Sequence, residues 1–375
     1  SWWGPDGTYH GPDGVYPEGV AGANTAKGVS ADMLRRHLLA LGGVAMAGQP
    51  VKHLGELLEL PGVAPGSVLL PSRISQVHVA KVRDLTQRLE DLSRTYGSDP
   101  EVSSTAVVWA QRLLDVPGAE LVRRELLVAV AELQLHAGWA GFDAGLHDRA
   151  MYHYSRGLEL ATRAGDKYLQ ALALGHAGLA TVEHGHPPDG LKLLQAAQVT
   201  SWDIPPDDKR MSPVGVTTRA AVEACGLADS ATALDRLGER EAAARALGKS
   251  RQLWTPARTD ANGDLDKVGA CLELAGGRLD AAERFAVASV RRWEGTSNQR
   301  ARANADLVLA TVHVQAGERD GLQLAHNAIT KVTKLSSVRA RQQYLTPLAV
   351  ALEARPGSDA EQLARTARQV TTTRA

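Results

Sequence analysis

Residues 131–166, AELQLHAGWAGFDAGLHDRAMYHYSRGLELATRAGD, decide the fold. In the first half, Leu135, Trp139 and Phe142 recur at helical spacing, and a second amphipathic segment follows Gly145. The stretch therefore predicts two helices joined by a tight turn at that glycine. Because one helical hairpin leaves a hydrophobic face uncovered, it needs further copies of itself to bury that face.

Glycines that separate one predicted helix from the next recur along the chain. They are spaced 39 or 40 residues apart, except for one interval of 53 residues that contains an insertion at 201–213, SWDIPPDDKRMSP. Small residues recur seven positions before most of these glycines and five positions after them, where two helices must approach closely. We therefore predict an all-α array of hairpins over 119–375, with an insertion loop on one face. Its turns lie near Gly145, Gly185, Gly238, Gly277, Gly317 and Gly357.

Two tryptophans repeat in register with the hairpins. Trp254 and Trp293 each follow their turn glycine by 16 residues. We interpret both as wedges between successive hairpins, and the alternative is a pair of rings that stack on a ligand.

This pattern resembles the tetratricopeptide repeat (TPR), which has small residues at its eighth and twentieth positions and a turn glycine between its helices. The resemblance implies a right-handed superhelix. The period of about 40 differs from the standard period of about 34 residues, and later copies lose several consensus positions.

Residues 136–166 are also similar to a signature of actinobacterial regulators of the XRE family. Those regulators carry a Cro/repressor-type helix-turn-helix DNA-binding domain followed by a TPR-like region. The resemblance covers most of 30–375, and implies effector or partner sensing in this chain, DNA contact only through an upstream domain, and a possible homodimer. We find no recognition helix before Gly42.

Composition excludes several classes of protein. The 375 residues carry 42 Lys and Arg against 42 Asp and Glu, whereas a nucleic-acid module standing alone should be basic. The two cysteines, Cys225 and Cys271, form neither a disulfide framework nor a CxxC motif, which favours a reducing, cytoplasmic compartment. No run of apolar residues is long enough for a membrane span, so we expect no membrane association.

The chain before the array divides into two parts. Residues 1–29 contain GPDG twice and several aromatic residues, which predicts a linker or an arm docked on the array. Residues 30–118 contain long amphipathic segments, and we expect them to form a helical cap over the exposed end of the array.

Signatures of catalysis and cofactor binding are missing from the sequence. We find no P-loop, HExxH, GxSxG or strand-linked GxGxxG motif, so we predict a protein that is not an enzyme and needs no cofactor or metal. Glu183-His184-Gly185-His186 offers two imidazoles, but its place on a turn favours a solvated loop over a metal site. Scattered basic residues are interpreted as solvated charge, with phosphate contact as the minor alternative; they are Arg123, Arg124, Lys331, Lys334, Arg339 and Arg341.

The remaining candidate is a concave groove. The resemblance implies that the first helix of each hairpin lines this groove, which would bind a peptide, a small-molecule effector or a protein partner. For Trp139 and Phe142 the alternative is packing between hairpins, and for the whole chain it is a protein–protein scaffold with no small-molecule site. The predicted groove residues are Glu132, Leu135, Trp139, Phe142, Asp143, Leu179, Glu183, Asp235, Arg236, Lys267 and Asn304.

Overall fold

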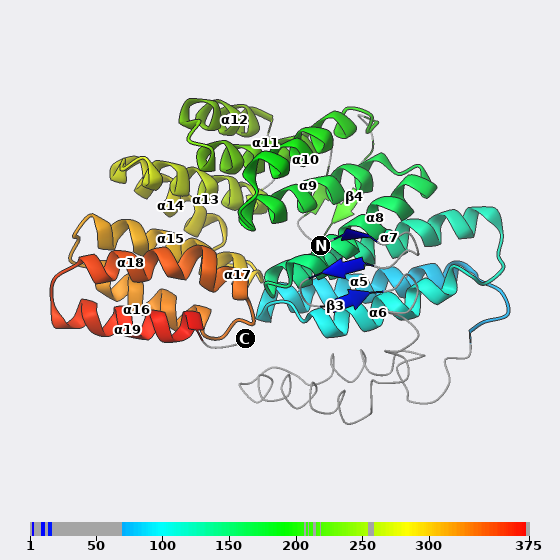
Figure 1. Cartoon of the computed structure of the whole chain (residues 1–375), viewed down its shortest axis with the longest axis horizontal. Helices are drawn as coiled ribbons and strands as arrows, with labels where there is room; N and C mark the ends of the chain where they lie inside the picture. The colour runs from blue at the N-terminus through cyan, green and yellow to red at the C-terminus, as the bar shows by residue number, and fades with distance from the viewer. Residues whose placement is uncertain are drawn as a thin grey trace, which may run out of the picture.

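The computed structural model describes residues 70–205, 208, 219–253 and 259–372, and the backbone of five short strands. For residues 259–263 it describes the backbone alone. From residue 76 onward the described chain is a succession of helices, interrupted by two short strands between α10 and α11 (Figure 1). They are α5 (Gln76–Tyr96), α6 (Pro100–Leu113), α7 (Glu120–Asp143), α8 (His147–Ala164), α9 (Lys167–Glu183), α10 (Pro187–Ser201), α11 (Arg219–Arg236), α12 (Arg240–Leu253), α13 (Thr259–Ala275), α14 (Leu279–Arg292), α15 (Gln299–Gln315), α16 (Gly321–Val332), α17 (Val338–Ala340), the π-helical η1 (Arg341–Leu345), α18 (Thr346–Ala354) and α19 (Ser358–Thr372).

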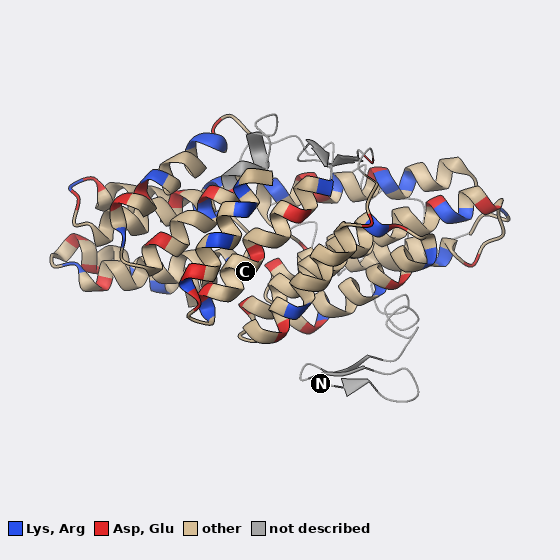
Figure 2. Cartoon of the chain, turned by 90° about the horizontal axis from the view of Figure 1, so that it is seen from above, with Lys and Arg blue, Asp and Glu red and all other residues tan. Residues whose placement is uncertain are grey.

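These helices form successive antiparallel pairs, which confirms the predicted all-α class. The pairs are α7 with α8, α9 with α10, α11 with α12, α13 with α14, α15 with α16, and α18 with α19. Each pair also packs on its neighbours along the chain (Figure 1). Basic and acidic residues are interspersed along the helices (Figure 2).

Short strands occur where the sequence analysis predicted none. β1 (Trp2–Trp3), β2 (Tyr9–Gly11) and β3 (Gly14–Tyr16) form an antiparallel sheet in the region predicted as a linker or docked arm. β4 (Arg210–Ser212) and β5 (Gly215–Thr217) pair within and just after the predicted insertion loop. Whether the side chains of 1–29 dock on the array lies outside the described residues, as does 30–69 of the predicted cap.

All six predicted turn glycines have a left-handed backbone, with φ between 72° and 118°. At five of these turns the N–H after the glycine returns to a carbonyl five residues earlier, as from Glu239 to Leu234 at 2.9 Å. This geometry caps the preceding helix, and glycine adopts it at the lowest cost because it has no Cβ. The described helices therefore change direction at these glycines.

The small residues lie where two helices of a pair cross closely. A Cβ on Gly138 would lie 2.5 Å from the ring of Tyr154, and one on Gly178 would lie 2.7 Å from Leu194. In later hairpins the same offset is filled by alanines with no exposed surface, such as Ala231. The predicted close contacts are thus present, and they fix how tightly each hairpin closes.

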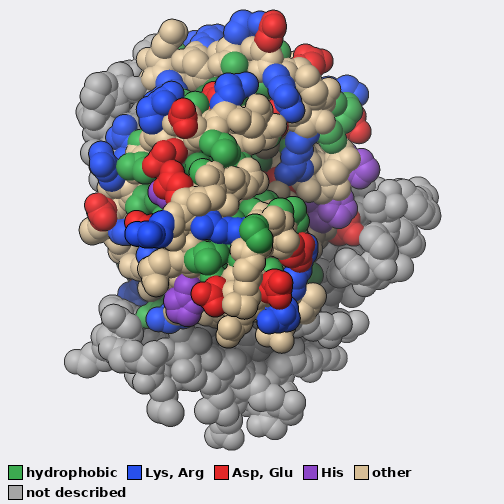
Figure 3. Space-filling view, turned by 90° about the vertical axis from the view of Figure 1, so that its left-hand side faces the viewer, with side chains coloured by type: hydrophobic (Ala, Val, Ile, Leu, Met, Phe, Trp, Pro, Cys, Tyr) green, Lys and Arg blue, Asp and Glu red, His purple; other side chains and the backbone are tan. Residues whose placement is uncertain are grey.

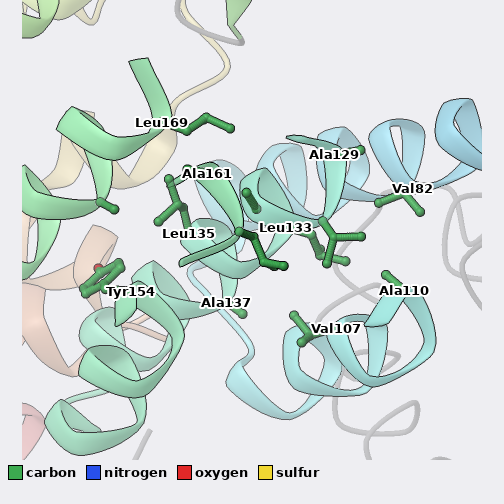
Figure 4. Packing of buried hydrophobic residues seen from close by; sticks show 14 of the residues in the cluster. Val82, Val107, Ala110, Ala129, Leu133, Leu135, Ala137, Tyr154, Ala161 and Leu169 are labelled. Carbon is green, nitrogen blue, oxygen red and sulfur yellow. The ribbon is translucent and has the colours of Figure 1, made fainter. Parts of the chain in front are cut away.

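The largest hydrophobic cluster joins α5 and α6 to the first two hairpins. Val82 on α5, Val107 on α6 and Leu133 on α7 belong to it, together with Leu169 on α9 (Figure 4). The helices before the array therefore cover its first hairpin, in the way that a solenoid needs a cap.

The first helices of the array meet segments from its later part. α15 packs on α5, and α17 packs on α7 (Figure 1). Ser336 donates from its backbone N–H to the carbonyl of Tyr96 at 2.8 Å, and a parallel bridge pairs Ser336 with Gly97. The inner ends of α9, α11 and α13 consequently face a chain segment from near the C-terminus.

Candidate functional site

Charged side chains from four helical segments meet on the inner side of the array. We define the inner charged cluster as Glu183 on α9, Asp229 on α11, Lys267 on α13, Arg339 on α17 and Tyr344 on η1. Asp229 is close enough to Glu183, Lys267 and Arg339 for their charges to affect the pKa of its carboxyl. The cluster thus draws on three hairpins and on the segment that closes the array.

A bidentate ion pair stands at the centre of this cluster. Arg339 donates from Nε and Nη2 to the two carboxylate oxygens of Glu183, at 2.8 and 2.6 Å. The two side chains are only 11% and 9% exposed. A paired guanidinium and carboxylate can remain charged at this depth, because each satisfies the other, whereas either one alone would be costly to bury.

The ring of Tyr344 lies close to two cations. Lys267 Nζ is 5.2 Å from the centre of this ring, and Arg339 is 5.8 Å from it. Lys267 also donates to Asp264 Oδ1 at 2.6 Å. Burial alone would lower the pKa of Lys267, but Asp264 and Tyr344 raise it above its ordinary value, so the ammonium group stays charged.

Asp229 is the exception in this network of pairs. No hydrogen bond or ion pair joins it to another described residue, and burial raises the pKa of its carboxyl to about 7, against the opposing effect of Arg339. Cys271, one turn beyond Lys267, has a thiol whose pKa burial raises to about 11, so it is not a thiolate nucleophile at neutral pH. The cluster can therefore bind charged groups, and it offers no activated thiol.

Ser337 explains how Arg339 reaches this position. Its hydroxyl accepts from the N–H of Ala340 and so caps the short α17, and the same hydroxyl donates to Asp143 Oδ1 at 2.7 Å. The wider turn of η1 follows directly and brings Tyr344 to the same side. The segment is thus anchored on the end of α7.

Asp143 forms a second polar site, which we call the Asp143 junction. Besides the bond from Ser337, its carboxylate accepts from the backbone N–H of Ser98 at 3.3 Å. It also forms an ion pair with Arg300, whose Nη1 lies 3.3 Å from Oδ2. The guanidinium of Arg300 also lies 5.5 Å from the ring centre of Trp139. This junction ties α7 to α15, α17 and the loop after α5.

The structure brings several predicted groove residues to these two sites and buries others. Glu183 and Lys267 belong to the inner charged cluster, and Asp143 is the centre of the junction. Arg236, an exposed residue at the end of α11, donates to the carbonyl of Val182 at 2.7 Å and to Gln343 at 2.9 Å. Asp235, which is half-buried, has a carboxyl whose pKa burial raises.

The aromatic pair lies at the boundary of core and inner face. Trp139 packs on the main hydrophobic cluster, and Phe142 is a buried member of it. Arg339 covers both rings, 5.6 Å from the centre of Trp139 and 4.9 Å from that of Phe142. The two rings therefore lie between the hydrophobic cluster and Arg339, and Trp139 is partly exposed.

The other predicted groove residues divide in the same way. Leu135 and Leu179 lie in the main hydrophobic cluster, at 3% and 9% exposure, and Asn304 is buried on α15. A ligand on the inner face cannot reach Leu135, which contacts Gly157 inside its own hairpin. Glu132 is half-buried on α7.

Sequence reasoning missed Asp229, Arg300, Arg339 and Tyr344. Arg339 and Tyr344 lie between two hairpins, where a register of repeats assigns no position. The interpretation of Arg339 and Arg341 as solvated was wrong: Arg339 pairs with Glu183, and Arg341 is 7% exposed and donates to the carbonyl of Leu335.

The remaining predictions concern the histidine turn and the tryptophans. His184 and His186 are exposed, as predicted for a solvated loop, and the ring of His184 stacks on that of His147 at 3.8 Å. Trp293 is 2% exposed and packs against α15, so its role as a wedge is confirmed. Trp254 lies outside the described residues.

Comparisons with known proteins assign no family to the chain. No protein-family model matches it, and no curated protein matches its sequence. Within the described part of the chain, each helix is too short or too polar to cross a lipid bilayer.

Proposed function

We propose that this chain is the effector-sensing region of a cytoplasmic bacterial transcriptional regulator. In this proposal the helix pairs are TPR-like units of a right-handed superhelix, a peptide or small amphipathic effector binds at the inner charged cluster, and DNA is contacted by a domain outside this chain. The resemblance of 136–166 to actinobacterial regulators supports the regulatory role. The inner charged cluster supports the location of the effector.

The observation that carries the proposal is the collection of charges on the inner face. Ion pairs of low exposure contribute little to stability, because removing two charges from water offsets their attraction. Glu183 with Arg339 and Asp264 with Lys267 nevertheless converge there around the ring of Tyr344. Such an arrangement suits a ligand that has an apolar body and a charged end, with an amine directed at Asp229.

The contact between the two ends of the array supplies a way to relay binding. The Asp143 junction and Arg339 hold the closing segment against α7. A ligand that binds the arrangement with the ends in contact more tightly than an opened one shifts the population toward it. The position of an attached DNA-binding domain would then depend on the effector.

Thermal unfolding tests this proposal. Peptides with a free amino terminus, octylamine and octanoate are screened against the chain, and every hit is measured by titration calorimetry. We expect a peptide or octylamine to raise Tm, and Asp229→Asn to weaken its binding at least about tenfold, as loss of a charged partner does. Asp189→Asn, at an exposed site on α10, is the matched control and should leave affinity unchanged.

Two results would count against the effector site. In the first, a ligand binds equally well to the Asp229→Asn and Glu183→Gln proteins. In the second, no small ligand changes Tm while a defined protein forms a stable complex, which would indicate the protein–protein scaffold instead.

The end formed by α14, α16, α18 and α19 shows acidic, basic and hydrophobic side chains intermixed (Figure 3).

A further inference from the structure

A second group of ligand-type side chains lies far along the array, at the turn around Gly317. His313 is near the end of α15, Glu318 follows the turn glycine, and Glu283 lies on α14 of the preceding hairpin. His313 Nδ1 is 2.8 Å from Glu318, and Nε2 is 3.4 Å from Glu283. One nitrogen and two carboxylate oxygens, one from each residue, lie within 4.8 Å of one another.

The repeat explains why these three positions meet. Counted from the turn glycines, the equivalents around Gly185 are Thr181, His186 and Met151, and Thr181 Oγ1 contacts the sulfur of Met151 at 4.0 Å. The fold therefore brings the position four residues before the turn glycine against the preceding hairpin at this turn as well.

Around Gly277 the same positions hold Glu273, Arg278 and Ala244, and Arg278 pairs with Glu273. That junction is closed by an ordinary ion pair, with no third ligand. Among these three junctions, the one around Gly317 alone combines an imidazole with two carboxylates.

The surroundings of His313 suit a cation. Its side chain is 14% exposed, and among the described residues neither ring nitrogen has a partner in hydrogen-bond geometry, although a carboxylate oxygen is close to each. The two glutamates are 40% and 44% exposed, so an ion can enter from solvent.

We propose that His313, Glu283 and Glu318 bind a divalent transition metal ion of the zinc type, with water in the remaining positions. One imidazole nitrogen with carboxylate oxygens is a donor set that Zn²⁺ accepts, whereas Ca²⁺ and Mg²⁺ prefer oxygen ligands alone. Side-chain rotations bring the three atoms to the roughly 2.0–2.2 Å of a zinc bond.

Binding would join two consecutive hairpins. Glu283 belongs to the α13–α14 pair, and His313 and Glu318 belong to the next one. A metal ion held by all three stabilises the folded array, because the unfolded chain offers no such arrangement of ligands.

Titration calorimetry and thermal unfolding of the whole chain with ZnCl₂ test the site. Both are carried out in a protein with His147, His184 and His186 replaced by Asn, so that the neighbouring surface imidazoles do not contribute. We expect one equivalent of Zn²⁺ to bind and to raise Tm, while CaCl₂ has no effect. His313→Gln should abolish this binding, and Glu318→Gln should weaken it about 10–100-fold.

Glu273→Gln is the matched control, because it changes the equivalent position of the preceding repeat and should leave Zn²⁺ binding unchanged. The unfolding curve without metal shows whether each variant is folded, and Glu318→Gln keeps the shape of an exposed side chain. Zn²⁺ binding that persists undiminished in folded His313→Gln and Glu318→Gln would overturn the proposal. So would a parent protein that binds no Zn²⁺, which would identify the group as an ion-paired histidine.

Discussion

Replacement of Asp143 by alanine should separate the two ends of the array. The side chain is 2% exposed, and its carboxylate accepts from Ser98 and Ser337 and pairs with the guanidinium of Arg300. The substitution leaves the guanidinium of Arg300 buried without this partner, and breaking such a pair costs about 3–5 kcal/mol. Arg300 is 14% exposed and also lies near two serine hydroxyls, so we expect the lower end, about 3 kcal/mol.

The assay combines urea unfolding with hydrogen exchange. The free energy of unfolding should fall by that amount, and the amide of Ser336, which donates to Tyr96 across the contact, should exchange faster. Asp143→Asn keeps an acceptor for the hydroxyl of Ser337, so its free energy of unfolding should fall less than that of Asp143→Ala. If Asp143→Ala cost no more than the exposed Asp189→Ala, and Ser336 stayed protected, Asp143 would not hold the ends together.

Other substitutions separate the forces that shape the array. Gly238→Ala places a side chain in open space at φ 82° and should lower the free energy of unfolding by about 1–2 kcal/mol. Gly138→Ala brings a methyl group to 2.5 Å from the ring of Tyr154 and should lower it further in the same urea titration. Trp293→Ala removes a buried ring and should lower the free energy of unfolding by about 3–5 kcal/mol. The control is Trp202→Ala at an exposed position, and a larger loss in that control than in Trp293→Ala would contradict the packing of Trp293. The raised pKa of Asp229, about 7 in the folded protein, means that the stability it contributes is full below pH 4 and is lost as pH rises through 7. Asp229→Asn should therefore have a free energy of unfolding about 1–2 kcal/mol higher than the parent protein at pH 8. If the difference between the two proteins were the same at pH 5 and pH 8, the carboxylate of Asp229 would not destabilise the fold.

Local signals in the sequence predicted the hairpins well, because each hairpin is made by residues close together in the chain. A left-handed turn needs a glycine, and a close crossing needs a small residue such as Gly138, so both leave periodic traces. The strands of residues 2–16 and 210–217 interrupt this pattern and were not predicted.

The candidate site was harder to predict, because it depends on contacts between distant parts of the chain. Glu183 and Arg339 are separated by 156 residues, and Asp143 and Ser337 by 194. A register copied from repeat to repeat identified Glu183, Lys267 and Asp143, but it assigns no position to a segment between hairpins. Nothing in a single hairpin indicates that α15 and the segment before the last hairpin return to the first helices.

The contact between Gly97 and Ser336 leaves no room for a side chain at residue 97. The φ of Gly97 is 94°, and a Cβ built there would lie 2.5 Å from the carbonyl oxygen of Ser336. The addition of one methyl group at this position would wedge the two segments apart, with no charge removed and no core residue altered. A single-residue change at Gly97 would therefore be enough to break the contact between this segment and Ser336.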